Sequence, residues 1–250
     1  MTVCIGVCGA TGKMGQMIIQ RMNGFNACTL STTFTRKNSI DDLAEFCQNS
    51  DVIIDFSSSE ILEKLLDYAI SYNNKLVIGT TGLTQYQLDH LNVASKSLAI
   101  LYSANMSLGA NLLTVLAEKA AKILDNTYDI EILDCHHRMK KDAPSGTAIM
   151  LGKAVAKARN LDFDEYAVFN RSQKGQRQPD EIGISSIRGG QVHGEHEVLF
   201  LGNNQVLSIK HQALSKESFA DGAIQAAVWL FDKPAGLYSM RDMFSLLQKC

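Results

Sequence analysis

Strand and helix signals alternate from the first residues of this 250-residue chain. Short apolar runs with the length of buried strands are each followed by a stretch with helical periodicity. These runs are TVCIGVC, ACTLSTTF, DVIIDFS, KLVIGTT and LAILYSA. Repeated strand–helix units of this length predict a parallel, doubly wound sheet of the Rossmann type, whose ligands bind at the carboxyl ends of the strands.

A glycine-rich turn joins the first strand to the first helix. Gly9, Gly12 and Gly15 form G-x-x-G-x-x-G between TVCIGVC and an amphipathic segment. In the dinucleotide fingerprint, such a turn brings backbone N–H groups and a helix N-terminus onto a pyrophosphate. The position of the turn at the start of the chain therefore predicts a nicotinamide dinucleotide cofactor.

The end of the second strand bears on which cofactor binds. An NAD-specific site places Asp or Glu there against the ribose 2′-hydroxyl, whereas this chain has Thr35-Arg36-Lys37. The Arg36 guanidinium can form two hydrogen bonds with a 2′-phosphate, and Lys37 adds positive charge. We therefore predict NADPH in preference to NADH; in the alternative, both side chains only contact solvent.

The segment from Asp129 to Ala148 carries the densest set of reactive side chains. Ile130 and Ile132 alternate with acidic residues as in a strand, and Ser145-Gly146 opens a helix. A helix start with basic residues just upstream is suited to an anionic ligand, and His136 or Lys140 could supply a proton. The alternative is a solvated basic loop that precedes an ordinary helix.

The pattern changes after this segment. Residues 182–213 alternate like antiparallel strands, with a hairpin turn at 202–204, and residues 170–181 form a polar loop that could move over a substrate. A helical pattern resumes after Ser215. We interpret the histidines of this region, His193, His196 and His211, as structural or surface residues.

Composition excludes several classes of protein. A net charge of −2 and a pI near 6.3 provide no electrostatic footprint for nucleic acid or an anionic membrane. No signal pattern or membrane-spanning run is evident, which predicts a cytoplasmic protein. The six cysteines show no metal-ligand spacing and no CxxC pair, so we expect no metal site and no disulfide framework.

Several motifs resemble one enzyme family over nearly the whole chain. GATGKMG, VIGTTG, SANMSLGAN, EILDCHHRMKKDAPSGTA and IGISSIRGGQVHGEHEVLF are similar to segments of the dihydrodipicolinate reductases, also called 4-hydroxy-tetrahydrodipicolinate reductases. The resemblance implies NAD(P)H-dependent reduction of 4-hydroxy-tetrahydrodipicolinate to tetrahydrodipicolinate, in diaminopimelate and lysine biosynthesis. It also implies a cytoplasmic homotetramer that accepts NADPH or NADH.

The resemblance also implies roles for particular residues. The catalytic residues would be His136 as proton donor and Lys140 as its partner, and the substrate would be bound by His137, Gly146 and Thr147, with Arg138 among the basic residues expected to bind it. The cofactor would contact two groups of residues in addition to Arg36, namely the loop Gly9, Ala10, Thr11, Gly12, Lys13 and Met14, and the strand ends Gly79, Thr80, Thr81, Ser103, Ala104, Asn105 and Met106.

The family layout implies two domains. Residues 1–107 and 217–250 would form the nucleotide domain, and residues 108–216 an α+β substrate and tetramerisation domain with a mixed or antiparallel sheet. Three departures stand out: Thr35 replaces a glutamate common in members that use NADH well, the connection 36–50 is short, and Asp134 replaces a common glutamate.

Two other functions stay open at this point. A semialdehyde dehydrogenase would share the nucleotide domain and use Cys135 as its nucleophile, although Cys135 and His136 are strand neighbours and point to opposite faces. An NADPH sensor without turnover would keep the fold but would not need the pair of His136 and Lys140.

Overall fold

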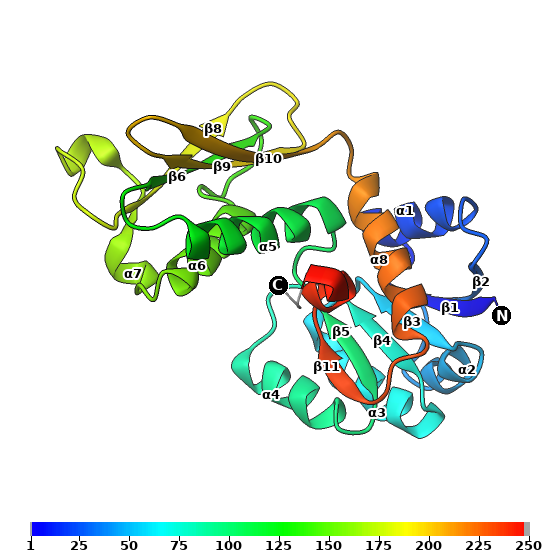
Figure 1. The fold of residues 1–250 in the computed structure, drawn as a ribbon. Helices are drawn as coiled ribbons and strands as arrows, with labels where there is room; N and C mark the ends of the chain where they lie inside the picture. Colours follow the sequence, from blue (N-terminus) through cyan, green and yellow to red (C-terminus); the bar gives the residue numbers. More distant parts are fainter. Residues whose placement is uncertain (1, 248–250) are drawn as a thin grey trace. The chain divides into compact units, whose positions relative to one another are not determined.

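The computed structural model describes residues 2–247, and the chain divides into two compact units (Figure 1). Unit 1 contains residues 1–108 and 217–250, and unit 2 contains residues 109–216. The predicted domain boundary at 107/108 lies one residue before this division.

Unit 1 is built on a parallel six-stranded sheet with the order β11-β5-β4-β3-β1-β2. All its strand pairs are parallel, as the repeated strand–helix units predicted. The edge strand β11 is one that the sequence patterns did not indicate. The strands are β1 (Val3–Cys8), β2 (Cys28–Phe34), β3 (Val52–Asp55), β4 (Lys75–Ile78), β5 (Ala99–Tyr102) and β11 (Gly236–Tyr238).

Helices cover both faces of this sheet because its central strands, β1, β3, β4 and β5, are apolar on both sides. Val52 and Ile54 of β3 pack in one core with α1 and α8, whereas Ile53 packs in a second core with α2, α3 and α4. The helices are α1 (Lys13–Met22), α2 (Asp42–Gln48), α3 (Leu62–Tyr72), α4 (Gln85–Ala94) and α8 (Glu217–Leu230), with 3-10 turns at Ser59–Ile61 and Met240–Leu247.

Unit 2 contains a mixed five-stranded sheet with the order β10-β9-β6-β8-β7. The β9–β10 hairpin is antiparallel as predicted, but β8 pairs in parallel with β6, which lies between β8 and β9. Residues 182–213 are therefore not one antiparallel run, because β8 connects to β9 across β6. The strands are β6 (Asp129–His136), β7 (Ala167–Val168), β8 (Ile182–Arg188), β9 (Gly194–Leu201) and β10 (Val206–Ala213).

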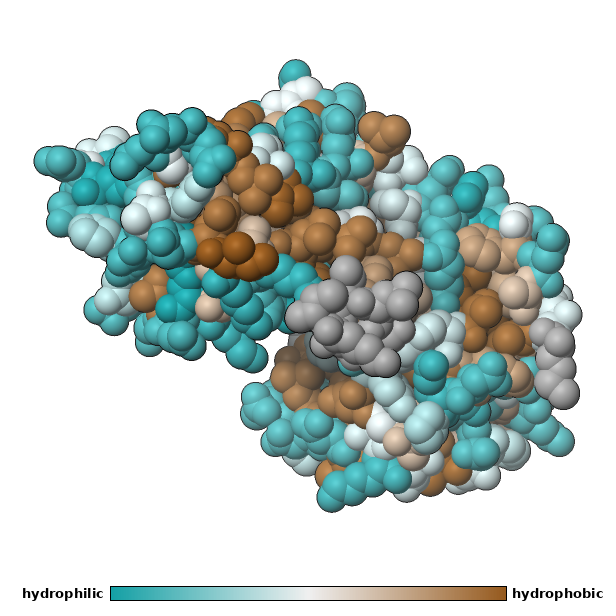
Figure 2. Space-filling model, viewed as in Figure 1, coloured by the Kyte–Doolittle hydropathy of each residue, from teal (hydrophilic) through white to brown (hydrophobic). Residues whose placement is uncertain are grey.

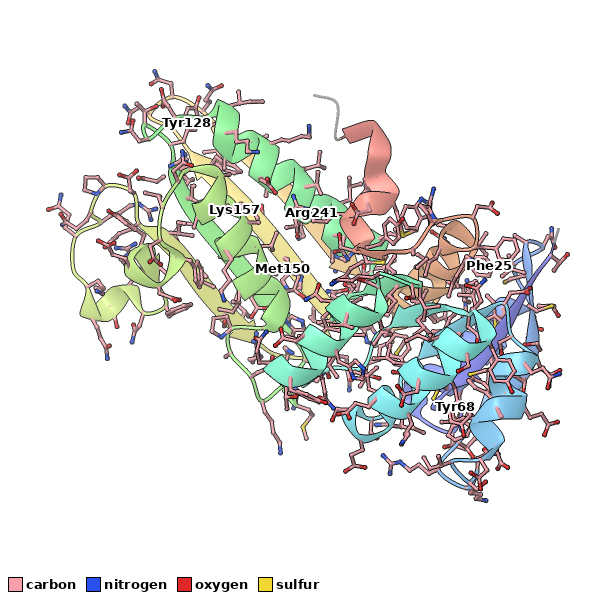
Figure 3. All side chains as sticks on the ribbon, turned by 90° about the horizontal axis from the view of Figure 1, so that it is seen from below. Phe25, Tyr68, Tyr128, Met150, Lys157 and Arg241 are labelled. Carbon is pink, nitrogen blue, oxygen red and sulfur yellow. The ribbon has the colours of Figure 1, made fainter. Side chains whose placement is uncertain are left out.

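Two helices cover one face of the mixed sheet. Apolar residues of α5 (Leu108–Ile123) and α6 (Gly146–Ala158) pack on Ile130, Ile132 and Phe200. Met150 and Lys157 mark α6 in Figure 3. A short helix α7 (Phe163–Tyr166) and a 3-10 turn (Arg171–Gln173) follow α6.

The polar segment 170–181 is bound to the sheet by ion pairs. Arg177 pairs with Glu131 and, through Nε, lies 3.0 Å from Asp129 Oδ1, while Arg171 pairs with Glu181 within the segment and lies 3.8 Å from Glu131 Oε1 of β6. These contacts hold both halves of the segment that the sequence suggested could move over a substrate.

Hydrophilic and apolar residues are mixed over the visible surface of each unit (Figure 2). Among residues 2–247, no helix combines the length and the apolar character needed to cross a membrane.

Candidate active site

The glycine turn of unit 1 allows a close approach of backbone to backbone. Gly9 has a φ of +84°, in the left-handed region, and a Cβ on Gly15 would lie 2.3 Å from the Gly9 carbonyl oxygen. A side chain at Gly15 would therefore separate α1 from the turn. Gly12 caps α1 with no side chain over the helix start. Unpaired N–H groups at that start and a cradle too tight for a Cβ are features that fit a dinucleotide pyrophosphate.

A cleft of about 270 Å³ adjoins this turn. Arg36 lines it and is exposed, while Thr35 is held in place because its N–H and hydroxyl both donate to Asn38 Oδ1 at 2.9 Å. The residues that line the cleft include no carboxylate, although Glu60 lines the hollow next to it. The residues around the cleft are Gly9, Thr11, Gly12, Phe34, Thr35, Arg36, Phe56, Ser57, Ser58 and Ile61.

The predicted nicotinamide-side residues follow two neighbouring strands. Residues 79–81 follow β4 and residues 103–106 follow β5, and the Ser103 N–H donates to the Ile78 carbonyl. Two of these residues, Thr80 and Met106, have side chains that contact the protein interior. The Thr80 hydroxyl donates to Asp55 Oδ2 at 2.6 Å, and Met106 is buried in the core. These two positions can face a ligand only through their backbone.

Asp55 is a buried residue that sequence analysis did not single out. It ends β3 and accepts hydrogen bonds from the Ser57 N–H, the Ser57 hydroxyl and the Thr80 hydroxyl. Burial raises the pKa of its carboxyl, and the hydrogen bonds from Ser57 and Thr80 partly oppose that rise. Asp55 therefore fixes the loops at the carboxyl ends of β3 and β4.

In unit 2, the alternation of β6 decides which side chains meet. Asp134 and His136 are buried on the face covered by helices, and Cys135 lies on the opposite face. His136 Nδ1 is 2.8 Å from Asp134 Oδ1, a contact of ion-pair length whose angle departs from that of an aligned hydrogen bond. Cys135 consequently cannot pair with His136.

The buried Asp134 carboxylate is the centre of this site. Its Oδ2 accepts from Arg188 Nη2 and from the Ser145 N–H, both at 2.8 Å, and from the Ser186 hydroxyl at 3.1 Å. His196 Nε2 lies 3.4 Å from Oδ1. Burial by itself would raise the pKa of Asp134, but the contacts from His136, His196, Arg188 and Ser145 outweigh it and hold that pKa well below its usual range. Asp134 is therefore an anion.

The loop between β6 and α6 carries the predicted substrate groups. Lys140 Nζ lies 2.8 Å from Asp142 Oδ2, and Arg188 Nη2 donates to the Asp142 carbonyl at 2.8 Å. Arg138 is exposed, whereas His137 is half-buried. The loop thus presents positive charge beside His136.

The start of α6 is open to a ligand. The Ser145 hydroxyl caps the helix by accepting from the Ala148 N–H, and no atom lies within 4 Å of a Cβ built on Gly146. The first N–H groups of a helix lack partners within the helix, and the open space at Gly146 makes this helix start suited to a carboxylate.

Sequence analysis did not assign three residues of this cluster to the site, namely Asp134, Arg188 and His196, and it expected Ser145 only as part of the helix start. His196 was interpreted as a structural or surface residue; it is buried, and its ring meets that of His136 edge-on at 5.2 Å between centroids. The spacing of Asp134 two positions before His136 on a strand was a usable signal, because such residues share a face. Arg188 and His196 reach the site only through strand pairing.

Asp134, His136 and His196 are also three potential metal ligands whose ligand atoms lie within 4.8 Å of one another. Arg188 already pairs with the same carboxylate, and its positive charge would repel a cation there. The cluster is therefore better suited to holding an imidazole than a metal ion.

A Rossmann-type unit with a dinucleotide cradle, joined to a unit that presents a carboxylate-held histidine and an anion site, defines the class of NAD(P)H-dependent oxidoreductases. Comparison with known protein families identifies the family within this class. Sequence models of the N-terminus and the C-terminus of dihydrodipicolinate reductase match residues 3–106 and 109–244. The chain belongs to the dihydrodipicolinate reductase family.

Curated relatives and a solved structure agree with this assignment. The 4-hydroxy-tetrahydrodipicolinate reductase of Rickettsia bellii is 57% identical over 99% of this chain and 96% of its own length, and that of Campylobacter concisus is 44% identical over 98% and 99%. A dipicolinate-bound dihydrodipicolinate reductase from Paenisporosarcina sp. TG-14 has the same fold, with a TM-score of 0.79 at 22% identity over 96% of this chain and 98% of that one. The predicted family, fold class and reductase activity are confirmed.

Gly194 provides a test of the space around His136. A Cβ at position 194 would lie 3.1 Å from His136 Nε2, a distance that requires the ring to shift. We expect Gly194→Ala to lower kcat by about tenfold, because His136 is predicted to be the proton donor and small displacements of such a group are costly. NADPH affinity, measured by fluorescence titration, should not change. An unchanged kcat would mean that the ring has room to move without loss.

Proposed function

We propose that this chain catalyses the NAD(P)H-dependent reduction of 4-hydroxy-tetrahydrodipicolinate to tetrahydrodipicolinate in diaminopimelate and lysine biosynthesis. The reaction consumes one NAD(P)H and one proton and releases NAD(P)⁺ and water. The observation that carries the proposal is the carboxylate-held His136 beside a basic loop and an open helix start, in a chain of this family. When bound, the nicotinamide supplies the hydride.

The substrate is a dicarboxylate, and the chain offers it two kinds of donor. The start of α6 at Gly146 and Thr147, with the positive end of the helix dipole and open space at Gly146, suits one carboxylate. His137 and the exposed Arg138 add hydrogen-bond donors and positive charge from the preceding loop. These four residues bind the substrate and orient it.

His136 donates the proton, and Lys140 assists it. Nδ1 of His136 faces Asp134, so the proton leaves from Nε2, on the other side of the ring near Gly194. Lys140 lies in the same loop with its ammonium group against Asp142, where it stabilises negative charge that develops on the substrate. Positioning and electrostatics are the protein's share of the chemistry.

The proton-donor role is tested by replacing the two residues. In an assay that couples NADPH oxidation to substrate made in situ by the preceding synthase, we expect His136→Gln and Lys140→Gln each to lower kcat by about 10²–10³-fold, the scale of general acid and electrostatic contributions. NADPH affinity should be nearly unchanged.

The exposed neighbour Lys141 provides the matched control, and Lys141→Gln should keep kcat within about twofold. Near-normal turnover by His136→Gln would remove His136 from the donor role. If the wild-type chain did not oxidise NADPH in this assay, the proposed reaction itself would fail.

We assign cofactor binding to unit 1 and propose that NADPH is preferred. The cradle of Gly9, Ala10, Thr11, Gly12, Lys13 and Met14 binds the pyrophosphate, the segments 79–81 and 103–106 lie on the nicotinamide side, and Arg36 binds the 2′-phosphate. Support comes from the exposed Arg36 at the cleft and from the absence of a carboxylate in the lining of that cleft. NADH would bind the same cradle without the contact to Arg36.

Replacing Arg36 tests this preference. Arg36→Gln should raise the KM for NADPH by about ten- to a hundredfold, since a charge-assisted hydrogen bond contributes about 1.5–3 kcal/mol. The KM for NADH should change little. Lys64→Gln, at an exposed position on α3, is the control. Equal kcat/KM for the two cofactors in the wild-type chain would contradict the preference.

We further propose that the chain assembles as a homotetramer through the uncovered face of the unit 2 sheet. This face carries apolar side chains, with Ile187 and Val206 each more than half exposed. Charged residues, among them Glu195, Glu197 and Lys210, lie between these apolar side chains on the same face. Exposed apolar side chains in such a mixed face favour burial against a partner. The apolar residues whose strand position places them there are Leu133, Cys135, Ile187, Leu199, Leu201 and Val206.

Light scattering on the purified protein tests the assembly. We expect a mass of about four times the 27.4 kDa chain, and we expect Ile187→Asp to shift it to a smaller species because burying an unpaired charge is costly. Ile123→Asp, at an exposed position on α5, is the control. A monomeric wild-type protein would exclude the tetramer.

A further inference from the structure

We propose that Asp134 is the positioning residue of His136 and that it fixes the tautomer in which Nδ1 carries the hydrogen. This inference rests on the proposed function where it concerns turnover. Its structural content concerns the free protein and can be tested without substrate.

Strand geometry places the two side chains together. Residues two apart on β6 share a face, and His136 Nδ1 lies 2.8 Å from Asp134 Oδ1. Nδ1 is enclosed in the protein, where the contact with Asp134 Oδ1 is of ion-pair length but is not an aligned hydrogen bond, whereas Nε2 lies on the other side of the ring, next to Gly194. The ring is therefore held with Nδ1 toward Asp134 and Nε2 near the backbone of Gly194 in β9.

The chemistry of the inward contact selects a tautomer. An ionised carboxylate only accepts hydrogen bonds, so the nitrogen that faces it must carry a hydrogen. A neutral imidazole has one N–H, and placing it on Nδ1 leaves Nε2 without one. His136 can then carry its transferable proton on Nε2 and return to the Nδ1–H form after donation. A carboxylate that holds a catalytic imidazole in this way is known from the Ser-His-Asp triad.

Arg188 and Ser145 keep the carboxylate ionised and immobile. Arg188 Nη2 and the Ser145 N–H both bind Oδ2, which leaves Oδ1 for the two histidine rings. Arg188 also donates to the Asp134 and Asp142 carbonyls. The same guanidinium therefore holds Asp134 and the loop that carries Lys140, which couples the position of His136 to that of Lys140.

His196 completes the enclosure. Its Nε2 lies 3.1 Å from the Ser145 hydroxyl and 3.4 Å from Asp134 Oδ1, and its ring meets the edge of His136. Contacts on two sides thus limit rotation of the His136 ring. The position of the His136 ring therefore depends on three features: Asp134 two residues before it on β6, the guanidinium of Arg188, and Ser145 at the start of α6.

Nitrogen NMR on full-length protein with ¹⁵N-labelled histidine tests the tautomer directly. His136→Gln assigns the signals, and spectra are recorded at a pH where the ring is neutral. We expect wild-type His136 to show a pyrrole-type Nδ1 and a pyridine-type Nε2. Asp134→Asn should introduce the Nε2–H form, because an amide can donate as well as accept. Asp164→Asn, an exposed change on α7, should leave the signals unaltered.

Two results would overturn the proposal: an Nε2–H tautomer in the wild-type protein, or an unchanged tautomer in Asp134→Asn. The wild-type spectrum decides the first even if the variant does not fold. Arg188→Lys gives a milder perturbation. The carboxylate and a positive charge beside it remain, but the planar guanidinium that also donates to the Asp134 and Asp142 carbonyls is lost, and the change should broaden or split the His136 signals.

Kinetics then separate positioning from binding. We expect Asp134→Asn to lower kcat by about 10- to 100-fold, the usual effect of losing a group that orients a functional histidine, with the KM for substrate and the NADPH affinity within about threefold. A rise in KM at constant kcat would contradict the positioning role. If the wild-type protein had no activity, the proposed function would fail while the NMR result still decided the tautomer.

Discussion

The ion pair of the buried Asp134 with the half-buried Arg188 joins four parts of unit 2 that are distant in sequence. Arg188 ends β8, Asp134 lies near the end of β6, and through Ser145 and Asp142 the same contacts reach the start of α6 and the basic loop. Removing one partner of a buried pair leaves an uncompensated charge and typically costs about 3–5 kcal/mol. The positions of His136 and Lys140 therefore depend on the ion pair between Asp134 and Arg188, two residues to which we assign no contact with the substrate.

Unit 1 also contains a buried carboxylate that holds loops at the ends of strands. Asp55 is buried at the end of β3, where hydroxyl groups from Ser57 and Thr80 hold it. It sits beneath the loops that we assign to the cofactor, as Asp134 sits beneath the groups that we assign to the substrate. In both units a buried carboxylate at a strand end organises polar loops, because loop backbones at the carboxyl ends of strands have few other fixed partners.

Much of the site followed from local pattern. The glycine turn, the helix start at Ser145 and the reactive segment 136–147 each lie within one short stretch, so spacing and chemistry alone pointed to them. Other features did not. Thr80 and Met106 were expected on the nicotinamide side, but their side chains turn inward to Asp55 and to the core. Which way a loop side chain points depends on the hydrogen bonds and cavities that the fold leaves available.

Local sequence thus decided the strand–helix alternation, the glycine turn between β1 and α1 and the start of α6, because each depends on neighbours within a few positions. Strand order needed the tertiary structure: β8 pairs in parallel with β6, although its alternation resembles that of an antiparallel strand. That pairing brings Arg188 to Asp134, 54 residues away. Periodicity reports which face of a strand is buried but not which strand lies beside it, so the partners of a buried charge are fixed only when the chain has folded.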